Sequence, residues 1–156
     1  MTMRIVKEVS TRIVEGKGEA DIPKSEIIVS EQPTGRLISG AILEAAVQCN
    51  GFYLLLMTDD TPFEEMLSIY LLDNRWNLLD SAVLGGIYST GTFSAMKLEE
   101  PNLVHFRFIG ETDWSVEVLT KPRFRFPFIP DVAGVKRDGG FRRYFIVHGR
   151  PYNTSK

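Results

Sequence analysis

The amino-acid sequence predicts an all-β fold, an antiparallel β-sandwich or flattened barrel of about nine or ten strands with minimal helix. Between residues 52 and 120, short apolar runs are separated by turn residues about every ten positions, the spacing typical of such folds. Two pairs of runs flank strong turn signals, Asn50-Gly51 and the Asp/Asn-rich segment 73–77. A further pair, on either side of residue 110, alternates apolar and polar residues with the period of a strand.

The length of 156 residues fits a single domain, 1–156, in which a basic segment rich in Phe and Pro, residues 121–150, closes the sheet. A domain of this size buries roughly 70% of its unfolded surface, so it needs no disulfide or metal to fold. Hydrophobic residues make up 44% of the chain and charged residues 24%, the balance of a globular protein rather than a disordered one.

Cysteine content and hydropathy indicate the compartment. The single cysteine, Cys49, has no intramolecular partner for a disulfide, which fits a reducing compartment. The first residues contain no apolar stretch of the length found in a signal peptide. The longest clear apolar run, residues 52–57, is far too short to cross a membrane. We therefore expect a soluble cytoplasmic protein that makes no contact with a membrane.

The N-terminal third is expected to contain two strands before the first strong turn signal. Residues 3–14 are rich in β-branched side chains and should form one strand. After a loop rich in Gly and charge, residues 26–29 should form a short strand that ends in a turn at 32–35, the Gln-Pro-Thr-Gly segment.

Asn50-Gly51 is expected to join a strand at 37–49 to a strand at 52–58, because a two-residue type I′ turn needs positive φ at both positions. This turn fixes the register of the hairpin and makes one of its faces almost wholly apolar. The pairs predicted on that face are Cys49 with Phe52, Val47 with Leu54, Ala45 with Leu56 and Leu43 with Thr58.

The next segment allows a short helix followed by a second hairpin. Thr61 and Glu64 form a capping box, with Pro at the favoured first helical position, so residues 62–65 should form one helical turn. The apolar runs 67–72 and 78–84 then flank an Asp/Asn-rich turn and should pair as antiparallel strands.

A strand at 93–98, a turn at 99–102 and a third hairpin complete the run. The hairpin should pair residues 103–109 with 114–119. Pairing Phe108 with Trp114 makes one face apolar and sets His105 opposite Glu117 and Arg107 opposite Ser115 on the polar face. A last strand at 141–148 should follow a long ordered loop, with Phe145, Val147 and Arg143 on one face.

Charge is distributed unevenly along the chain. Residues 1–120 hold 9 Lys and Arg against 18 Asp and Glu, whereas residues 121–156 hold 9 against 2. Arginines alternate with aromatic residues in the basic part, a pattern found in proteins that bind single-stranded nucleic acid. The pI near 5.7 disfavours that function, and we expect these arginines to pair with the acidic part of the chain. The candidate binding residues are Arg107, Arg123, Arg125, Arg142, Arg143, Tyr144 and His148.

Candidates for catalysis and metal binding are few. His105 with Glu117 is the one acid–base pair that the register predicts, with Ser115 as the nearest nucleophile. No nucleophile elbow, zinc motif or phosphate-binding loop is present. An acidic loop offers oxygen ligands, but its spacing matches no calcium loop, so we expect no metal or other cofactor. Its carboxylates are Asp59, Asp60, Glu64 and Glu65.

Together these features predict a non-catalytic interaction protein of the kind that neutralises or adapts a protein partner. Two alternatives remain open at this stage. A meander of strands can close into a small-molecule-binding β-barrel carrier, and His105 with Glu117 could serve a hydrolase. Self-association as a homodimer is expected in each case, because a strand-rich domain exposes edges that a second copy can cover.

Overall fold

The computed structural model describes most of the chain, and all of the described part that is regular is β-strand. The described residues are 3–15, 23–59, 66–85, 92–108, 112–124, 135–137 and 142–149. The strands are β1 (Met3–Ile5), β2 (Val9–Glu15), β3 (Lys24–Val29), β4 (Gln32–Ser39), β5 (Ile42–Cys49), β6 (Phe52–Thr58), β7 (Leu67–Leu72), β8 (Leu78–Leu84), β9 (Ser94–Glu99), β10 (Leu103–Arg107), β11 (Asp113–Phe124), β12 (Val135–Arg137) and β13 (Arg142–Gly149).

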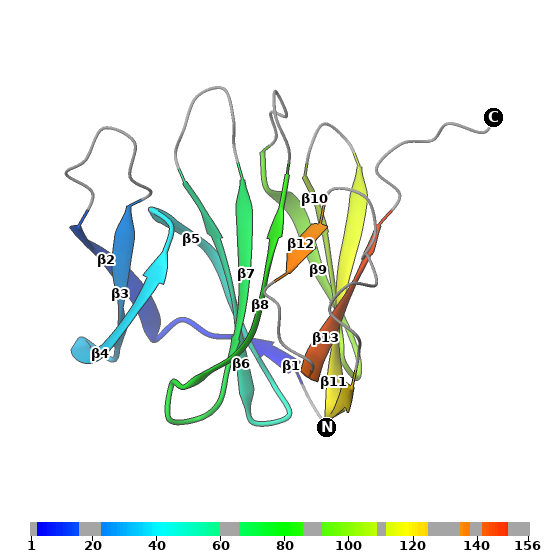
Figure 1. Ribbon diagram of the computed structural model, residues 1–156, viewed down its shortest axis with the longest axis horizontal. Helices are drawn as coiled ribbons and strands as arrows, with labels where there is room; N and C mark the ends of the chain where they lie inside the picture. Colours follow the sequence, from blue (N-terminus) through cyan, green and yellow to red (C-terminus); the bar gives the residue numbers. More distant parts are fainter. Residues whose placement is uncertain are drawn as a thin grey trace.

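The strands form three antiparallel sheets that pack as layers (Figure 1). A six-stranded sheet, in the order β1-β5-β6-β7-β8-β12, lies in the middle. A four-stranded sheet, β13-β11-β10-β9, covers one of its faces, and a three-stranded sheet, β2-β3-β4, covers the other. The predicted antiparallel β-sandwich is therefore confirmed, with an additional layer and open sheets rather than a closed barrel. The described residues form thirteen strands instead of the nine or ten predicted.

The central sheet is buried on both faces, and β7 shows this most clearly. All six of its residues are buried. Leu67, Ile69 and Leu71 belong to the apolar cluster shared with the four-stranded sheet. Tyr70 and Leu72 belong to the cluster shared with the three-stranded sheet. A strand covered on both sides has no solvent-facing side, which is why β7 is apolar on both faces, with Ser68 as its one small polar residue.

Large side chains from the outer sheets fill the two interfaces. Phe106, Trp114 and Phe145 point from the four-stranded sheet into the first cluster and are at most 2% exposed. Ile27 points from the three-stranded sheet into the second cluster and is fully buried. Burying a side chain of this size contributes about 1.5–3 kcal/mol, so these contacts hold the layers together.

The chain passes between layers at two points that the sequence reading missed. The expected strand 3–14 is two strands, β1 in the central sheet and β2 in the three-stranded sheet. The expected strand 37–49 is interrupted in the same way, because β4 ends in the outer sheet and β5 begins in the central one. At the second crossing Gly40 has φ 131°, and a Cβ there would lie 2.8 Å from Cβ of Met57. Only glycine allows the two layers to approach so closely at this point.

The turn between β3 and β4 was also misplaced. The structure turns at Ser30 and Glu31, with φ 49° and 70°, and not at residues 32–35. These are the two positive φ values of a type I′ turn, although neither residue is one that usually favours it. Pro33, which suggested the turn, lies on the edge strand β4, where a missing N–H is tolerated.

The Asn50-Gly51 hairpin forms as predicted. Asn50 and Gly51 have φ 56° and 81°, and the predicted pairs from Cys49–Phe52 to Ala45–Leu56 are all present. The fourth pair differs, because the register shifts between Leu43 and Ala45 and Leu43 lies opposite Met57 instead of Thr58. A β-bulge of this kind adds one residue to one strand and cannot be read from alternation alone.

The β7–β8 hairpin also forms with the predicted strand bounds. Its turn places Trp76 at φ 66°, a left-handed conformation that is unusual for a bulky residue. Asp73 stabilises the turn by accepting hydrogen bonds from two of its backbone N–H groups. The Trp76 ring stacks on Tyr53 with 4.3 Å between ring centroids, at the margin of the second apolar cluster. The helical turn predicted at 62–65 lies outside the described residues.

A buried ion pair joins the central sheet to the four-stranded sheet. Asp80 on β8 bonds to Arg137 on β12, and the side chains are 6% and 3% exposed. Asp80 also accepts the backbone N–H of Tyr144 on β13 at 2.8 Å. The Arg137 guanidinium lies 4.3 Å from the Phe145 ring centroid and donates to the Phe145 carbonyl at 3.3 Å. These contacts agree with the expectation that arginines of the basic segment pair with the acidic part of the chain.

The basic segment contains more strand than the sequence predicted. β11 continues to Phe124, past the expected end at residue 119, and β12 forms within the expected loop, pairing with β8. Pro122 is accommodated in β11 because the register with β13 shifts between Val118 and Arg123.

The crossing at Gly40 gives a stability test. We expect Gly40→Ala to lower the free energy of unfolding by about 3 kcal/mol, since it combines a disfavoured φ with a contact to Met57 that is too close. Gly35→Ala is the matched control, because Gly35 has φ 79° but open space around its Cβ position. It should cost only about 1 kcal/mol of backbone strain. Urea denaturation measures the free energy of unfolding of both variants. Equal losses would contradict the claim that the close contact with Met57 requires glycine at position 40.

The Asp80–Arg137 pair gives a second test. Asp80→Ala should lower the free energy of unfolding by about 3–5 kcal/mol, because it removes the carboxylate from a buried guanidinium. Replacing both partners with apolar residues, Asp80→Leu with Arg137→Met, should recover most of that loss. Asp113→Ala breaks the exposed pair with Arg107 and should cost less than about 1 kcal/mol. Similar losses for Asp80→Ala and Asp113→Ala would show that the buried pair does not join the sheets.

Candidate binding surface on the four-stranded sheet

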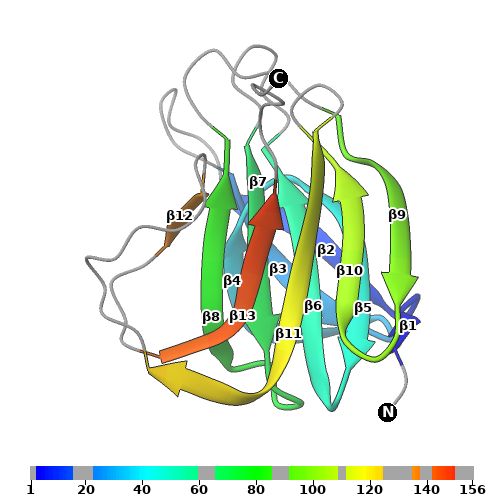
Figure 2. The ribbon, with the colours of Figure 1, turned by 90° about the vertical axis from the view of Figure 1, so that its right-hand side faces the viewer.

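The four-stranded sheet has one apolar face and one polar face, and the polar face is solvent-exposed. Figure 2 looks onto this sheet, with β13, β11, β10 and β9 side by side in front of the central sheet. Successive residues of a strand point to opposite faces. On β10, Val104 and Phe106 are buried in the first apolar cluster, while His105 is partly exposed and Arg107 exposed. The polar residues of the alternation therefore form the outer surface of the molecule on this side.

The strand register sets these outward residues in rows across the sheet. His148, Ser115, His105 and Lys97 lie opposite one another on the four strands. On one side of this row lies a shorter one, and on the other side a row that mixes acidic and apolar residues. The flanking rows are Asp113, Arg107 and Ser94, and Ile146, Glu117, Leu103 and Glu99.

The predicted cross-strand pairing of His105 with Glu117 is wrong. His105 lies opposite Ser115, and Leu103 lies opposite Glu117. The β10–β11 register differs from the predicted one by two residues, so Phe106, and not Phe108, faces Trp114. A buried hydrogen bond of 3.1 Å from the Trp114 indole Nε1 to the Phe108 carbonyl helps to fix this arrangement. Since a shift of two keeps every side chain on its face, the predicted apolar and polar faces are nevertheless correct.

Each histidine bonds to a different glutamate. His105 Nε2 is 2.7 Å from Glu99 Oε1, across to β9. His148 Nε2 is 3.0 Å from Glu117 Oε1, across to β11. Ser115 lies between the two histidines in the row, but both Nε2 atoms are directed to carboxylates rather than to its hydroxyl. Among the described residues, neither histidine therefore directs its Nε2 to a nucleophile, as the base of a serine hydrolase does.

Arg107 completes a third pair on the same face. Its Nε donates to Asp113 Oδ1 at 3.0 Å, and the two side chains are 49% and 76% exposed. It does not face Ser115, as the predicted register had placed it. Exposed pairs of this kind contribute about 0–1 kcal/mol each to stability. Their side chains are therefore free to exchange partners when another molecule binds.

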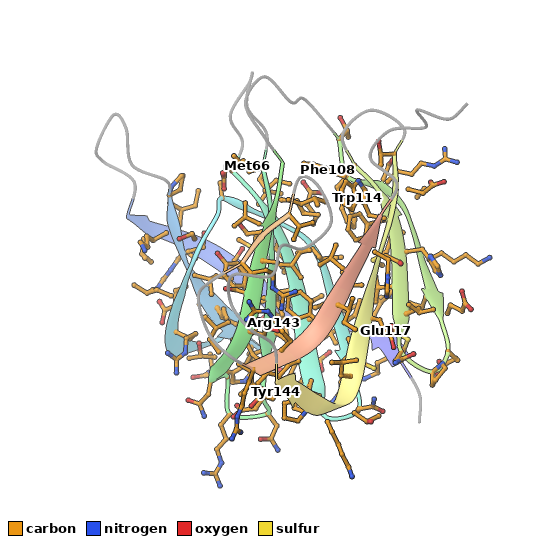
Figure 3. All side chains as sticks on the ribbon, turned by 45° about the vertical axis from the view of Figure 1, so that its right-hand side comes forward. Met66, Phe108, Trp114, Glu117, Arg143 and Tyr144 are labelled. Carbon is orange, nitrogen blue, oxygen red and sulfur yellow. The ribbon has the colours of Figure 1, made fainter. Side chains whose placement is uncertain are left out.

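Three of the other predicted binding residues lie at the beginning of β13. Arg143 is only 5% exposed and points inward from β13, whereas Arg142 is exposed and Tyr144 is partly exposed. Figure 3 shows Arg143 and Tyr144 toward the opposite end of the sandwich from Phe108 and Trp114.

Two further predicted binding residues, Arg123 and Arg125, lie near the end of β11. Arg123 pairs through its backbone with Arg143 on β13. Arg125 lies outside the described residues.

Neither cysteine chemistry nor a metal centre is evident among the described residues. Burial, together with the negative charge of Glu100, raises the pKa of the Cys49 thiol, which disfavours the reactive thiolate. In the described part of the chain, no three His, Cys, Asp or Glu side chains are grouped so that they could hold a metal ion. Of the acidic loop, Asp59 is described and follows β6, while Asp60, Glu64 and Glu65 lie outside the described residues.

The sequence did not lead us to the residues that pair with His105 and Arg107 on the polar face. Glu99 and Lys97 on β9 and Asp113 on β11 were not among the candidate residues. The turn at 99–102 was predicted, and it was the signal that could have found Glu99. A tight turn there sets Leu103 opposite Glu99 and His105 opposite Lys97, as the structure has them.

Comparison with known proteins adds no family assignment: no protein-family model, curated protein or solved structure matches this chain. Within the described ranges, no helix reaches the length and apolar character needed to cross a membrane.

Proposed function

We propose that this protein is a non-catalytic binding domain that engages a protein partner through the outer face of the four-stranded sheet. The observation that carries the proposal is the composition of that face. Three exposed pairs of acidic and basic groups surround the partly buried apolar side chains of Leu103 and Ile146. Apolar side chains bordered by polar and charged groups match the apolar centre and polar rim of protein–protein interfaces.

The rigidity of the sheet favours binding. Phe106, Trp114 and Val116 lock the inner side of the same strands into the core and are at most 2% exposed. A partner therefore meets a preformed surface, and little conformational entropy is lost when the complex forms. The outward charges can exchange their weak intramolecular partners for groups on the other protein.

Charge indicates the kind of partner. The first 120 residues carry twice as many acidic as basic residues, and they include most of this face. Complementary charge speeds association and selects against like-charged proteins. A protein partner that is basic overall, with acidic groups placed to meet Arg107 and Lys97, fits this surface best.

Both alternatives have less to support them. The hydrolase relied on His105 with Glu117, and these residues bond to different partners. The carrier relied on a closed barrel, whereas the described strands form three open sheets with large side chains packed between them.

Affinity capture from the native host tests the proposal. A triple variant of the face, His105→Ala with Arg107→Ala and Glu117→Ala, should lose partner enrichment at least about tenfold by quantitative mass spectrometry. Its free energy of unfolding should change by no more than about 1–3 kcal/mol, because the three pairs that it breaks are exposed.

A second triple variant controls for general loss of surface polarity. Ser10→Ala, Lys24→Ala and Gln32→Ala alter exposed residues of the three-stranded sheet. This control should capture the partner as the wild type does. Retention of the partner by the first variant, or equal loss from both, would contradict the proposed surface.

A further inference from the structure

β2 is a long edge strand. It lies at the margin of the three-stranded sheet, and among the described strands only β3 pairs with it. Figure 1 shows β2 at the outer side of the molecule, in the layer farthest from the four-stranded sheet. An edge strand of seven residues presents a row of backbone N–H and C=O groups that can pair with another strand.

The other edges of the described sheets carry devices that discourage pairing. β1 and β12 are three residues long, and β4 contains Pro33. β13 is contacted at its edge by Asp80, which accepts the Tyr144 N–H. β9 carries an outward Lys97. Short length, Pro, a covering group, Lys and β-bulges are the usual protections of sheet edges. β2 has a bulge between Ile13 and Glu15, but it is seven residues long and contains neither Pro nor Lys.

β2 instead exposes apolar side chains. Ile13 is 55% exposed, the largest exposure of a large hydrophobic side chain among the described residues, and Val14 is 38% exposed. Arg12 lies beside them with a side chain that is 65% exposed even though it bonds to Glu26 at 2.9 Å. The strand contains no proline. Its free edge thus combines backbone groups, exposed apolar side chains and a charge.

The sequence of this edge is complementary to itself. The segment Arg12-Ile13-Val14-Glu15, set antiparallel to a second copy, places Ile13 opposite Val14 and Arg12 opposite Glu15. Two-fold symmetry then produces each pair twice, with opposite charges flanking an apolar centre. The bulge in β2 supports this match, because Arg12 pairs with Glu26 and residue 15 with Lys24, two positions on one face of β3.

We propose that two copies of this chain pair antiparallel through β2 and join their three-stranded sheets into one sheet across a two-fold axis. Backbone hydrogen bonds supply the pairing, and the Arg12–Glu15 and Ile13–Val14 matches select the register. The inference is independent of the proposed function. It leaves the four-stranded sheet of each copy exposed on the far side of the central sheet, so the dimer presents that surface twice.

Sedimentation velocity over a concentration series tests the pairing. The wild type should show a monomer–dimer equilibrium. Arg12→Glu should weaken dimerisation by about tenfold or more, because like charges then meet at both symmetric positions. The charge swap Arg12→Glu with Glu15→Arg should restore it. Glu26→Gln removes the intramolecular partner of Arg12 but not the intermolecular one, so it should leave dimerisation unchanged.

Two results would overturn the proposal. One is a wild type that sediments as a monomer at every concentration. The other is a charge-swapped protein that stays monomeric while its circular dichroism spectrum and thermal midpoint match the wild type. As a backbone-level check, the amides of β2 should exchange more slowly as protein concentration rises, and exchange independent of concentration would also overturn the pairing.

Discussion

The structure depends on one constraint: the central sheet must be covered on both faces. β7 has no exposed position, and β6 has two apolar sets, with Leu54 and Leu56 in one cluster and Leu55 and Met57 in the other. Neither strand would be stable with one face in water, because each buried aliphatic side chain contributes about 1.5–3 kcal/mol. The outer sheets supply that cover, and the crossings at residues 6–8 and at Gly40 are where the chain leaves the central layer for the three-stranded sheet and returns from it.

Most strands, and the buried and exposed faces of β10 and β11, could be predicted from the sequence, while the partners across those two strands could not. Alternation has a period of two residues, so it determines which side of a strand is buried but not which of two registers is formed. At Asn50-Gly51 the turn type removed that ambiguity. Around residue 110 no such turn was available, and the predicted pairing missed by two residues, which assigned His105 to the wrong carboxylate.

The third layer was hidden for a related reason. A strand that crosses from one sheet to another keeps its β-branched composition, so 3–14 and 37–49 each read as a single strand. Gly40 marks the second crossing, but a lone glycine in a strand pattern is equally consistent with a bulge. The buried Asp80–Arg137 pair could not be found from local sequence either, since 57 residues separate its partners. Burial on both faces, long-range pairs and register are tertiary properties.

The central claim is that the doubly covered sheet is the most stable part of the protein. Native-state hydrogen exchange resolved by residue tests it most directly, because amides in the last region to open exchange only through global unfolding. The account predicts that the slowest amides lie in β6 and β7, with β9 and the edge strands opening at lower free energy. If the amides of β10 and β11 outlast those of β6 and β7, the four-stranded sheet is the stable unit and the account is contradicted.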